Sequence, residues 1–504
     1  MPAQKLFSTL LLVVLTISSN AQKNNPDLST LDAYIADAIK KFDQPGLAVG
    51  VVKDGELVYS NGFGKLDLAK PEPVDTNSIF FIASMSKAFT ACAVGLLVDD
   101  GKVDWNDPVV KHLPWFSTPD AYVSEHMMVK DLLCHRSGWG TFDGDLLWYG
   151  TDLTQREILD RHSKEPFSYA FRDEFGYSNI MFIAAAQLIE AVSGRTWDQF
   201  VTERILQPMQ MTRTTVETAD LARFENVALP HVRKGQDPNA PLKSMPYQAL
   251  QGADGACGIN SCINDLTKWD AMWANEGKVN GEPFITEATF NMITNAQLAM
   301  GGRRDGAALG WFVEYNNGEK VITHSGGMPG FILNHAVVPD KDLAVICLGN
   351  GESYSVFAIT AKILNMYLGD GSADPVADMI PRLAGRDERE AKRVAERVNA
   401  RAKGTKPTLT TSQIVGNYTD KIYGDVQIEE VAGKPVLNFP RAKELFTGDL
   451  EHWHYDTYKW NHADPFLEPG YITFYFDADH NVKGFKIDLH SPDFHFYKLD
   501  LVKE

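Results

Sequence analysis

The chain has 504 residues, of which 44% are hydrophobic and 23% charged, as in a folded soluble protein. This length exceeds one compact core and indicates two or three domains. Acidic residues number 66 and basic residues 48, giving a net charge of −18. Nucleic acid and anionic membrane surfaces would be repelled, so we expect neither as a partner.

The first residues have the pattern of a secretory signal. The segment MPAQKLFSTLLLVVLTISSNAQ contains one lysine, an apolar run from Leu6 to Ile17, and small residues at Ser19 and Ala21. A membrane-spanning helix would need roughly 20 apolar residues. We therefore expect cleavage after residues 1–21, a periplasmic or secreted protein, and no stable membrane insertion once the signal is removed.

The five cysteines are odd in number and stand mostly beside apolar residues: Cys92, Cys134, Cys257, Cys262 and Cys347. Buried free thiols are the favoured interpretation, and a bridge between Cys257 and Cys262 is the alternative. The sequence contains no His-Glu-x-x-His motif and no paired Cys-x-x-Cys motif. We expect neither a metal ion nor a cofactor.

Two strong turn signals predict β-hairpins far apart in the chain. Asp54-Gly55 interrupts the strand-like GLAVGVVKDGELVYSNGFG, and Asn317-Gly318 interrupts GWFVEYNNGEKVITHSGG. Two more strand-like runs, FILNHAVV and LAVICLG, follow the second hairpin around the turn PDKD. We expect these strands to form an antiparallel meander.

The segments between the two hairpins have helical periodicity, at residues 84–98, 180–192 and 266–277. Strands at both ends and helices between them predict an α+β domain over residues 22–368. Its antiparallel sheet would be assembled from both ends and flanked by helices, with an additional helical region.

The rest of the chain predicts a linker and a second domain. Residues 369–410 are rich in Gly, Pro and charge, and indicate a linker with one solvated, charged helix. Residues 411–504 are again β-like, with hairpins around Ala432-Gly433 and the turn at residues 479–481. A small all-β sandwich or barrel is the simplest account.

Ser84 and Lys87 open an otherwise apolar run, FFIASMSKAFTACAVGLLVDDGK, in which a charge is costly. Residues three apart lie on one helix face, so the hydroxyl and the ammonium can meet. The free N–H groups of a helix start favour an oxyanion and disfavour a protonated lysine. Such a lysine can activate a serine nucleophile. A capping serine with a snorkelling lysine is the alternative.

Two further segments could complete a site with these residues. FGYSNIMF places Tyr177 and Asn179 where a turn leads into a long apolar helix. VITHSGG ends a predicted strand with His324, Ser325 and two glycines, which allow the backbone to approach a ligand. Ordinary turn residues are the alternative for each segment taken alone.

Five motifs in this order resemble the serine β-lactamase and penicillin-recognising hydrolase superfamily: SMSKAFT, GKVDWNDPVVKHLP, VKDLLCHRSG, FGYSN and HSGGMPGF. The match runs from Leu31 to Leu368 and is most similar to the class C-like branch of esterases and D-aminopeptidases. In HRSG, the resemblance implies that His135 and Ser137 fix a loop. The C-terminal β domain is similar to the accessory domain of many members.

The resemblance implies that Ser84 is the acylated nucleophile, Lys87 its proton partner and Tyr177 a second general acid/base. A free tyrosine titrates near pH 10. We expect the cations at Lys87 and His324 to hold Tyr177 partly ionised at neutral pH.

The resemblance also implies substrate contacts at Asn179, His324 and Ser325, and an oxyanion hole from the backbone N–H groups of Ser84 and Gly327. His324 takes the place of the usual strand lysine of the superfamily. A largely neutral histidine binds a substrate carboxylate less firmly than lysine does. This favours ester or amide substrates, including peptides with D-residues.

These features predict an exported serine hydrolase that acts on a small-molecule or peptide substrate through an acyl-enzyme. One alternative is a true β-lactamase or D-Ala-D-Ala carboxypeptidase. Another is a penicillin-binding-type sensor or binding module with little turnover. The sequence leaves the natural substrate and the oligomeric state open.

Overall fold

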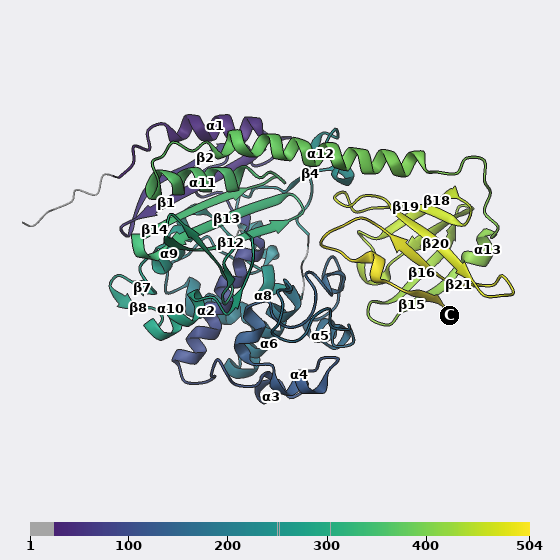
Figure 1. Cartoon of the computed structure of the whole chain (residues 1–504), viewed down its shortest axis with the longest axis horizontal. Helices are drawn as coiled ribbons and strands as arrows, with labels where there is room; N and C mark the ends of the chain where they lie inside the picture. Colours follow the sequence, from purple (N-terminus) through teal and green to yellow (C-terminus); the bar gives the residue numbers. More distant parts are fainter. Residues whose placement is uncertain (1–24, 249, 251, 303) are drawn as a thin grey trace, which may run out of the picture.

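The structure is a computed structural model that describes residues 25–248, 250, 252–302 and 304–504. The expected signal segment, residues 1–21, lies outside the described residues. Two bodies are visible in Figure 1, a larger one built from the first three quarters of the chain and a smaller barrel built from the C-terminal part.

The larger body is organised around an eight-stranded antiparallel sheet in the order β2-β1-β14-β13-β12-β11-β10-β9. Pairing of β1 with β14 joins the two ends of this part of the chain, as expected. The hairpins at Asp54-Gly55 and Asn317-Gly318 are confirmed. The strands are β1 (Gly46–Lys53), β2 (Glu56–Gly64), β9 (Leu298–Ala299), β10 (Gly306–Ala307), β11 (Phe312–Asn316), β12 (Glu319–Met328), β13 (Phe331–Val338) and β14 (Leu343–Gly349).

Helices cover both faces of this sheet. Strand β1 is buried along its whole length because alternate side chains enter two different cores. Leu47 and Val49 belong to the core under α1 (Leu31–Lys41) and α11 (Ser355–Leu368). On the other face, Gly50 lets α9 (Ile263–Ala274) approach closely, since a Cβ there would lie 2.8 Å from Ile263.

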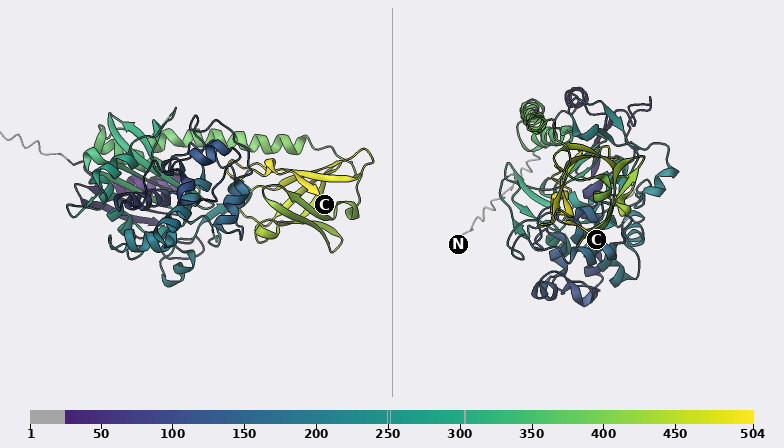
Figure 2. Two further views of the ribbon diagram at one scale, coloured as in Figure 1. Left: turned by 90° about the horizontal axis from the view of Figure 1, so that it is seen from below. Right: turned by 90° about the vertical axis from the view of Figure 1, so that its right-hand side faces the viewer.

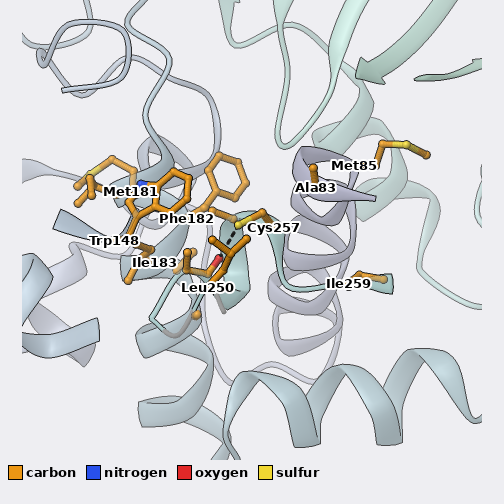
Figure 3. Packing of buried hydrophobic residues seen from close by; sticks show 14 of the residues in the cluster. Ala83, Met85, Trp148, Met181, Phe182, Ile183, Leu250, Cys257 and Ile259 are labelled. Carbon is orange, nitrogen blue, oxygen red and sulfur yellow. Dashed lines mark hydrogen bonds between the residues drawn. The ribbon is translucent and has the colours of Figure 1, made fainter. Parts of the chain in front are cut away.

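A helical region lies beside the sheet, with α2 (Ser86–Asp99) in its middle. Helix α2 is apolar on all sides and is accordingly buried among other helices. Phe182 from α6 (Asn179–Ser193) and Cys257 from α8 (Asp254–Cys257) lie near the turn that carries Ala83 and Met85 (Figure 3). The remaining α-helices here are α3 (Val109–His112), α4 (Ala121–His126), α5 (Gln155–His162), α7 (Trp197–Val201) and α10 (Glu287–Thr294).

All five cysteines are buried free thiols, so the alternative of a Cys257–Cys262 bridge is wrong. Within the described ranges, no helix is long and apolar enough to span a bilayer.

Helix α12 (Pro375–Asn399) runs from the larger body to the barrel (Figures 1 and 2) and is the expected charged helix. The C-terminal strands close into a barrel rather than a sandwich. The turns at Ala432-Gly433 and at residues 479–481 are confirmed. The barrel strands are β15 (Gly416–Asp420), β16 (Gly424–Val431), β17 (Lys434–Asn438), β18 (Thr447–His454), β19 (Thr457–His462), β20 (Gly470–Phe476), β21 (Val482–Asp488) and β22 (Leu501–Lys503).

The barrel contacts residues 139–165 of the larger body, and elsewhere the Gly235 N–H donates to the Pro465 carbonyl at 3.0 Å. Lys498 of the barrel forms ion pairs with Asp143 and, at 3.1 Å, with Glu165. Tyr149 of this segment stacks on Phe494 of the barrel, with ring centroids 3.9 Å apart. The barrel therefore holds this segment of the larger body in place.

Replacing Asp143 with asparagine is expected to lower the free energy of unfolding by about 2 kcal/mol, because Lys498 then loses its buried partner. Asp143 is only 2% exposed and also accepts a hydrogen bond from the Gly140 N–H. Denaturant unfolding would measure the loss. Asp37→Asn is the matched control, since its pair with Lys41 is exposed and contributes little. Equal effects of the two substitutions would contradict the expectation.

Candidate active site

Ser84 and Lys87 meet at the start of α2. Ser84 lies on the short 3₁₀ turn η1 (Ala83–Met85) rather than on the α-helix itself, and Lys87 follows on α2. Ala83 has a φ of 48°, a left-handed conformation that is uncommon for a residue with a side chain. The Lys87 Nζ donates to the Ser84 Oγ at 2.9 Å. A snorkelling lysine is wrong, because Lys87 is fully buried.

Two further acceptors fix the Lys87 amine. Nζ donates to Asn179 Oδ1 at 2.7 Å and to the Ala256 carbonyl at 2.9 Å. Both of these atoms can only accept hydrogen bonds. A neutral amine has two N–H groups, so donating them to these two acceptors leaves its lone pair toward Ser84. This arrangement is suited to taking the proton of the serine hydroxyl.

Burial lowers the pKa of Lys87 to about 8, and the neighbouring acidic groups Cys257 and Asp145 act in the opposite direction. The lysine is therefore mostly protonated at pH 7 and mostly neutral above pH 8. We expect kcat/KM for an activated ester to rise with pH up to about 8 and to level off above it. A pH–rate profile would measure this, and a flat profile between pH 6 and 9 would contradict Lys87 as the base.

Tyr177 completes a group of three side chains. Its ring centroid lies 5.0 Å from the Lys87 Nζ, and the nearby Ser84 side chain acts on the pKa of its phenol. Burial raises the pKa of Tyr177 above its usual value, although Ser84 and Arg304 act in the opposite direction. The expectation of a partly ionised Tyr177 is therefore wrong. In the free protein this phenol is protonated and can donate a proton.

His324 does not supply the cation that the sequence suggested for Tyr177. The ring is 1% exposed, and burial together with the positive charge of Lys87 holds its pKa well below the usual value. Nδ1 lies 2.7 Å from the Ser325 carbonyl and must therefore carry the proton. The other ring nitrogen, Nε2, has no hydrogen-bond partner among the described residues. His324 is accordingly neutral and presents an acceptor.

The end of β12 lies against the turn that carries Ser84. A Cβ on Gly326 would lie 2.2 Å from the Ile82 carbonyl, so only glycine permits this approach. Gly327 is exposed, with no described atom within 4 Å of the place where a Cβ would stand. Ser325, beside it, is partly buried. The strand end thus leaves open space next to the backbone of Gly327.

Asn179 occupies a different place from the one expected. The sequence suggested a substrate contact, yet Asn179 is 7% exposed and both ends of its amide are engaged within the protein. Oδ1 accepts from Lys87, and Nδ2 donates to Asp145 Oδ2 at 2.7 Å. Asn179 therefore bridges the lysine to a buried carboxylate.

Sequence reasoning missed Asp145. It lies at the start of the 3₁₀ turn η3 (Asp145–Leu147), in the loop that contacts the barrel, and is 2% exposed. Trp148 Nε1 donates to its Oδ1 at 2.9 Å. The one available signal was an acidic residue directly before the apolar run LLWYG.

His135 fixes the Tyr177 loop, as the motif HRSG suggested. Its ring stacks on Tyr177 with centroids 4.2 Å apart, and its Nδ1 accepts from the Ser178 N–H at 3.1 Å. The hydroxyl of Ser137 is buried without a hydrogen-bond partner in the part of the chain that the structure describes. His135 is therefore a loop-fixing residue, and Ser137 makes no such contact.

The described residues contain no cluster of three or more His, Cys, Asp or Glu side chains that could hold a metal ion.

Comparison with known families divides the chain in two. The beta-lactamase family matches residues 31–366, and a domain of unknown function (DUF3471) matches residues 400–503. The first match covers the sheet, the helical region and all three clustered side chains. The second covers the barrel.

Two curated proteins that are similar to this chain are a hydrolase and a penicillin-binding protein. The unguisins hydrolase ungD' of Aspergillus campestris (strain IBT 28561) is 29% identical over 376 residues, covering 67% of this chain and 65% of the relative. Penicillin-binding protein 4* of Bacillus subtilis (strain 168) is 27% identical over 319 residues, covering 59% of this chain and 66% of the relative. The chain thus spans just under two thirds of the length of each.

Solved structures share the fold at lower identity. An octameric penicillin-binding protein homologue from Pyrococcus abyssi has a TM-score of 0.63 at 22% identity, covering 95% of this chain and 100% of that one. The D-amino acid amidase from Ochrobactrum anthropi SV3, complexed with D-phenylalanine, has a TM-score of 0.57 at 22% identity, covering 68% and 98%. With a family match over well more than half of its length, the chain belongs to the beta-lactamase family, in the superfamily of serine β-lactamases and penicillin-binding proteins.

Proposed function

We propose that the protein is an exported serine hydrolase that cleaves ester or amide bonds through an acyl-enzyme on Ser84. One observation carries the proposal: the buried Lys87 amine lies 2.9 Å from the Ser84 hydroxyl, with its other N–H groups held by two acceptors. Burying a lysine in this way does not stabilise the fold, but it allows the amine to activate a serine nucleophile.

In the proposed acylation step, the Ser84 Oγ attacks the substrate carbonyl carbon while its proton moves to Lys87. The Tyr177 hydroxyl then protonates the leaving alcohol or amine as the scissile bond breaks. In deacylation a water molecule attacks the acyl carbonyl carbon and gives a proton to the Tyr177 phenoxide. The bond to the Ser84 Oγ then breaks, Ser84 regains its proton from Lys87, and the acid product leaves. The backbone N–H groups of Ser84 and Gly327 would bind the oxyanion, and such a donor typically contributes about 3 kcal/mol.

The neutral His324 supports ester or amide substrates over strongly carboxylate-dependent ones. A buried neutral imidazole accepts a hydrogen bond but does not attract an anion. The names of two similar proteins, an unguisins hydrolase and a D-amino acid amidase, point in the same direction. We favour amides, including peptides with D-residues. A β-lactamase or D-Ala-D-Ala carboxypeptidase and a slowly reacting penicillin sensor are the competing functions.

The location is proposed from the sequence of residues 1–21, whose pattern is that of a cleavable signal. A periplasmic or secreted enzyme follows from it. Determining the N-terminus of the protein recovered outside the cytoplasm would test this step.

To test the chemistry, the mature protein is treated with a fluorophosphonate and, separately, with a labelled penicillin. Mass spectrometry locates the label, while p-nitrophenyl esters and D-amino acid amides report turnover. Label on Ser84 with rapid turnover and no lasting penicillin adduct supports the proposal. A stable penicillin adduct without turnover supports the sensor, and rapid penicillin hydrolysis supports the β-lactamase. Label that persists in Ser84→Ala overturns the assignment of the nucleophile.

A further inference from the structure

A buried carboxylate lies behind the catalytic lysine, one amide away from it. Asp145 Oδ2 accepts from Asn179 Nδ2 at 2.7 Å, and Asn179 Oδ1 accepts from the Lys87 Nζ at 2.7 Å. Asp145 and Asn179 are 2% and 7% exposed, and Lys87 is fully buried. The chain Asp145–Asn179–Lys87–Ser84 is thus continuous, and its first three members are shielded from solvent, whereas Ser84 is partly buried.

The polarity of this chain follows from its donors. A lysine amine donates to its partner, so the Asn179 atom that faces Lys87 must be the carbonyl oxygen. The amide N–H₂ of Asn179 then faces Asp145. An acceptor at position 145 is therefore required for the amide that orients the lysine.

The contacts of Asp145 favour its ionised form. Both carboxylate oxygens accept N–H donors, one from Asn179 and one from Trp148. A protonated acid would need an acceptor for its O–H, and none is seen among the hydrogen bonds of the described residues. Burial raises the pKa of Asp145, and Asp493 of the barrel acts in the same direction, whereas the donors Trp148 and Asn179 and the Lys87 charge lower it. With both oxygens accepting N–H donors, the carboxylate is ionised beside a protonated Lys87.

Of the other titratable groups around Lys87, the thiol, the phenol and the two imidazoles are neutral at neutral pH, and Arg304, which acts on Tyr177, His135 and His324, is a cation. Burial raises the pKa of Cys257 to about 12 and also raises that of Tyr177. His135 and His324 both have a lowered pKa. Asp145 is accordingly the group in this described environment that can give Lys87 a compensating negative charge.

We propose that Asp145 is a positioning residue that acts on Lys87 through Asn179, fixing the amine against Ser84 and stabilising the ammonium formed when Lys87 takes the serine proton. Asp145 touches no substrate in this proposal. The inference rests on the proposed function, because it assigns Asp145 to the same proton transfer.

The barrel is part of the same arrangement. Asp145 belongs to the loop that Lys498 and Phe494 hold through Asp143 and Tyr149. Trp148, the second donor to Asp145, also makes an edge contact with Phe494, with ring centroids 6.3 Å apart. Barrel contacts thus lie within a few residues of the carboxylate on both sides.

The test is the pH dependence of the rate at which a fluorophosphonate labels Ser84. In this reaction the Ser84 Oγ bonds to phosphorus, fluoride leaves, and the serine proton passes to Lys87, so no natural substrate is needed. Asp145→Asn removes the charge that keeps the pKa of Lys87 up. We expect the rising limb of the profile to move about one pH unit lower, with a reduced plateau rate.

Asp143→Asn is the matched control, since it neutralises a buried carboxylate two residues away that contacts the barrel instead of Asn179. It should lose stability without moving the limb. The inference is overturned if the rising limb of the pH profile stays in place in a folded Asp145→Asn variant. It is also overturned if the limb moves by the same amount in Asp143→Asn. A merely structural role of Asp145 would lower the plateau and leave the limb in place.

A second variant decides the matter if Asp145→Asn does not fold or is not labelled at any pH. Trp148→Phe removes one of the two donors that stabilise the carboxylate, so a smaller movement in the same direction supports the inference and no movement overturns it. Failure of the proposed function is distinguishable. In that case the unaltered protein is not labelled on Ser84, whereas failure of the inference alone leaves labelling normal.

Discussion

Replacing Lys87 with methionine is expected to slow fluorophosphonate labelling of Ser84 by roughly 10³-fold, since the amine that is hydrogen-bonded to the hydroxyl and serves as its base is removed. Methionine fills nearly the same volume and carries no charge, so it suits a fully buried position. The loss should persist up to pH 10, because the variant has no amine to deprotonate. Labelling rates measured across pH by mass spectrometry would show this.

A matched control separates the chemistry from a general effect of losing a lysine. Lys41→Met removes a lysine whose side chain is 49% exposed on α1, and it should label at the normal rate. The Lys87→Met variant loses the donor to Asn179 Oδ1 and to the Ala256 carbonyl, so its folding must be checked by circular dichroism and thermal unfolding. A folded variant that labels within a few-fold of the normal rate would exclude Lys87 as the base.

The sheet and the barrel could be predicted because their signals are local. Asp54-Gly55 and Asn317-Gly318 specify tight turns between runs of alternating or continuous apolar residues, and each turn lies between paired strands. The same holds for Ala432-Gly433 in the barrel. Closure of the barrel, in contrast, requires β15 to pair with β22, and no turn signal specifies that long-range contact.

Proximity of Ser84, Lys87 and Tyr177 was expected from the order of motifs. The protonation states of these side chains could not be predicted in the same way, because they depend on how deeply each group is buried. The charge expected at His324 is missing because its ring is buried and lies near the positive charge of Lys87. Without that charge, desolvation raises the pKa of Tyr177.

Asp145 escaped prediction for a related reason. Its importance comes from Asn179, 34 residues later in the chain, and from the lysine beyond it. A single aspartate before an apolar run is not a distinctive sequence pattern. An aspartate that caps a helix or lies in a surface turn would stand in the same sequence context. Hydrophobic periodicity and turn residues predict local structure. They do not predict which side chains from distant parts of the sequence will contact one another in this site.

Replacing Tyr177 with phenylalanine is expected to slow both acylation and deacylation, by roughly 10² to 10³-fold. The phenol is protonated in the free protein, so its first task is to give a proton to the leaving group. The phenoxide then produced next to Lys87 can take a proton from water in deacylation. Phenylalanine keeps the ring that stacks on His135, so the fold should be retained. Pre-steady-state kinetics with a p-nitrophenyl ester would resolve the two steps.

The leaving group sharpens this expectation. p-Nitrophenolate leaves without needing a proton, whereas an amine must be protonated, so Tyr177→Phe should impair acylation by a D-amino acid amide more than acylation by the ester. Tyr122→Phe, at a position 65% exposed on α4, is the control and should leave both reactions unchanged. Equal losses of acylation with ester and amide would show that the phenol does not protonate the leaving group. Unchanged turnover of both substrates would remove Tyr177 from the mechanism and leave the lysine to carry both proton transfers.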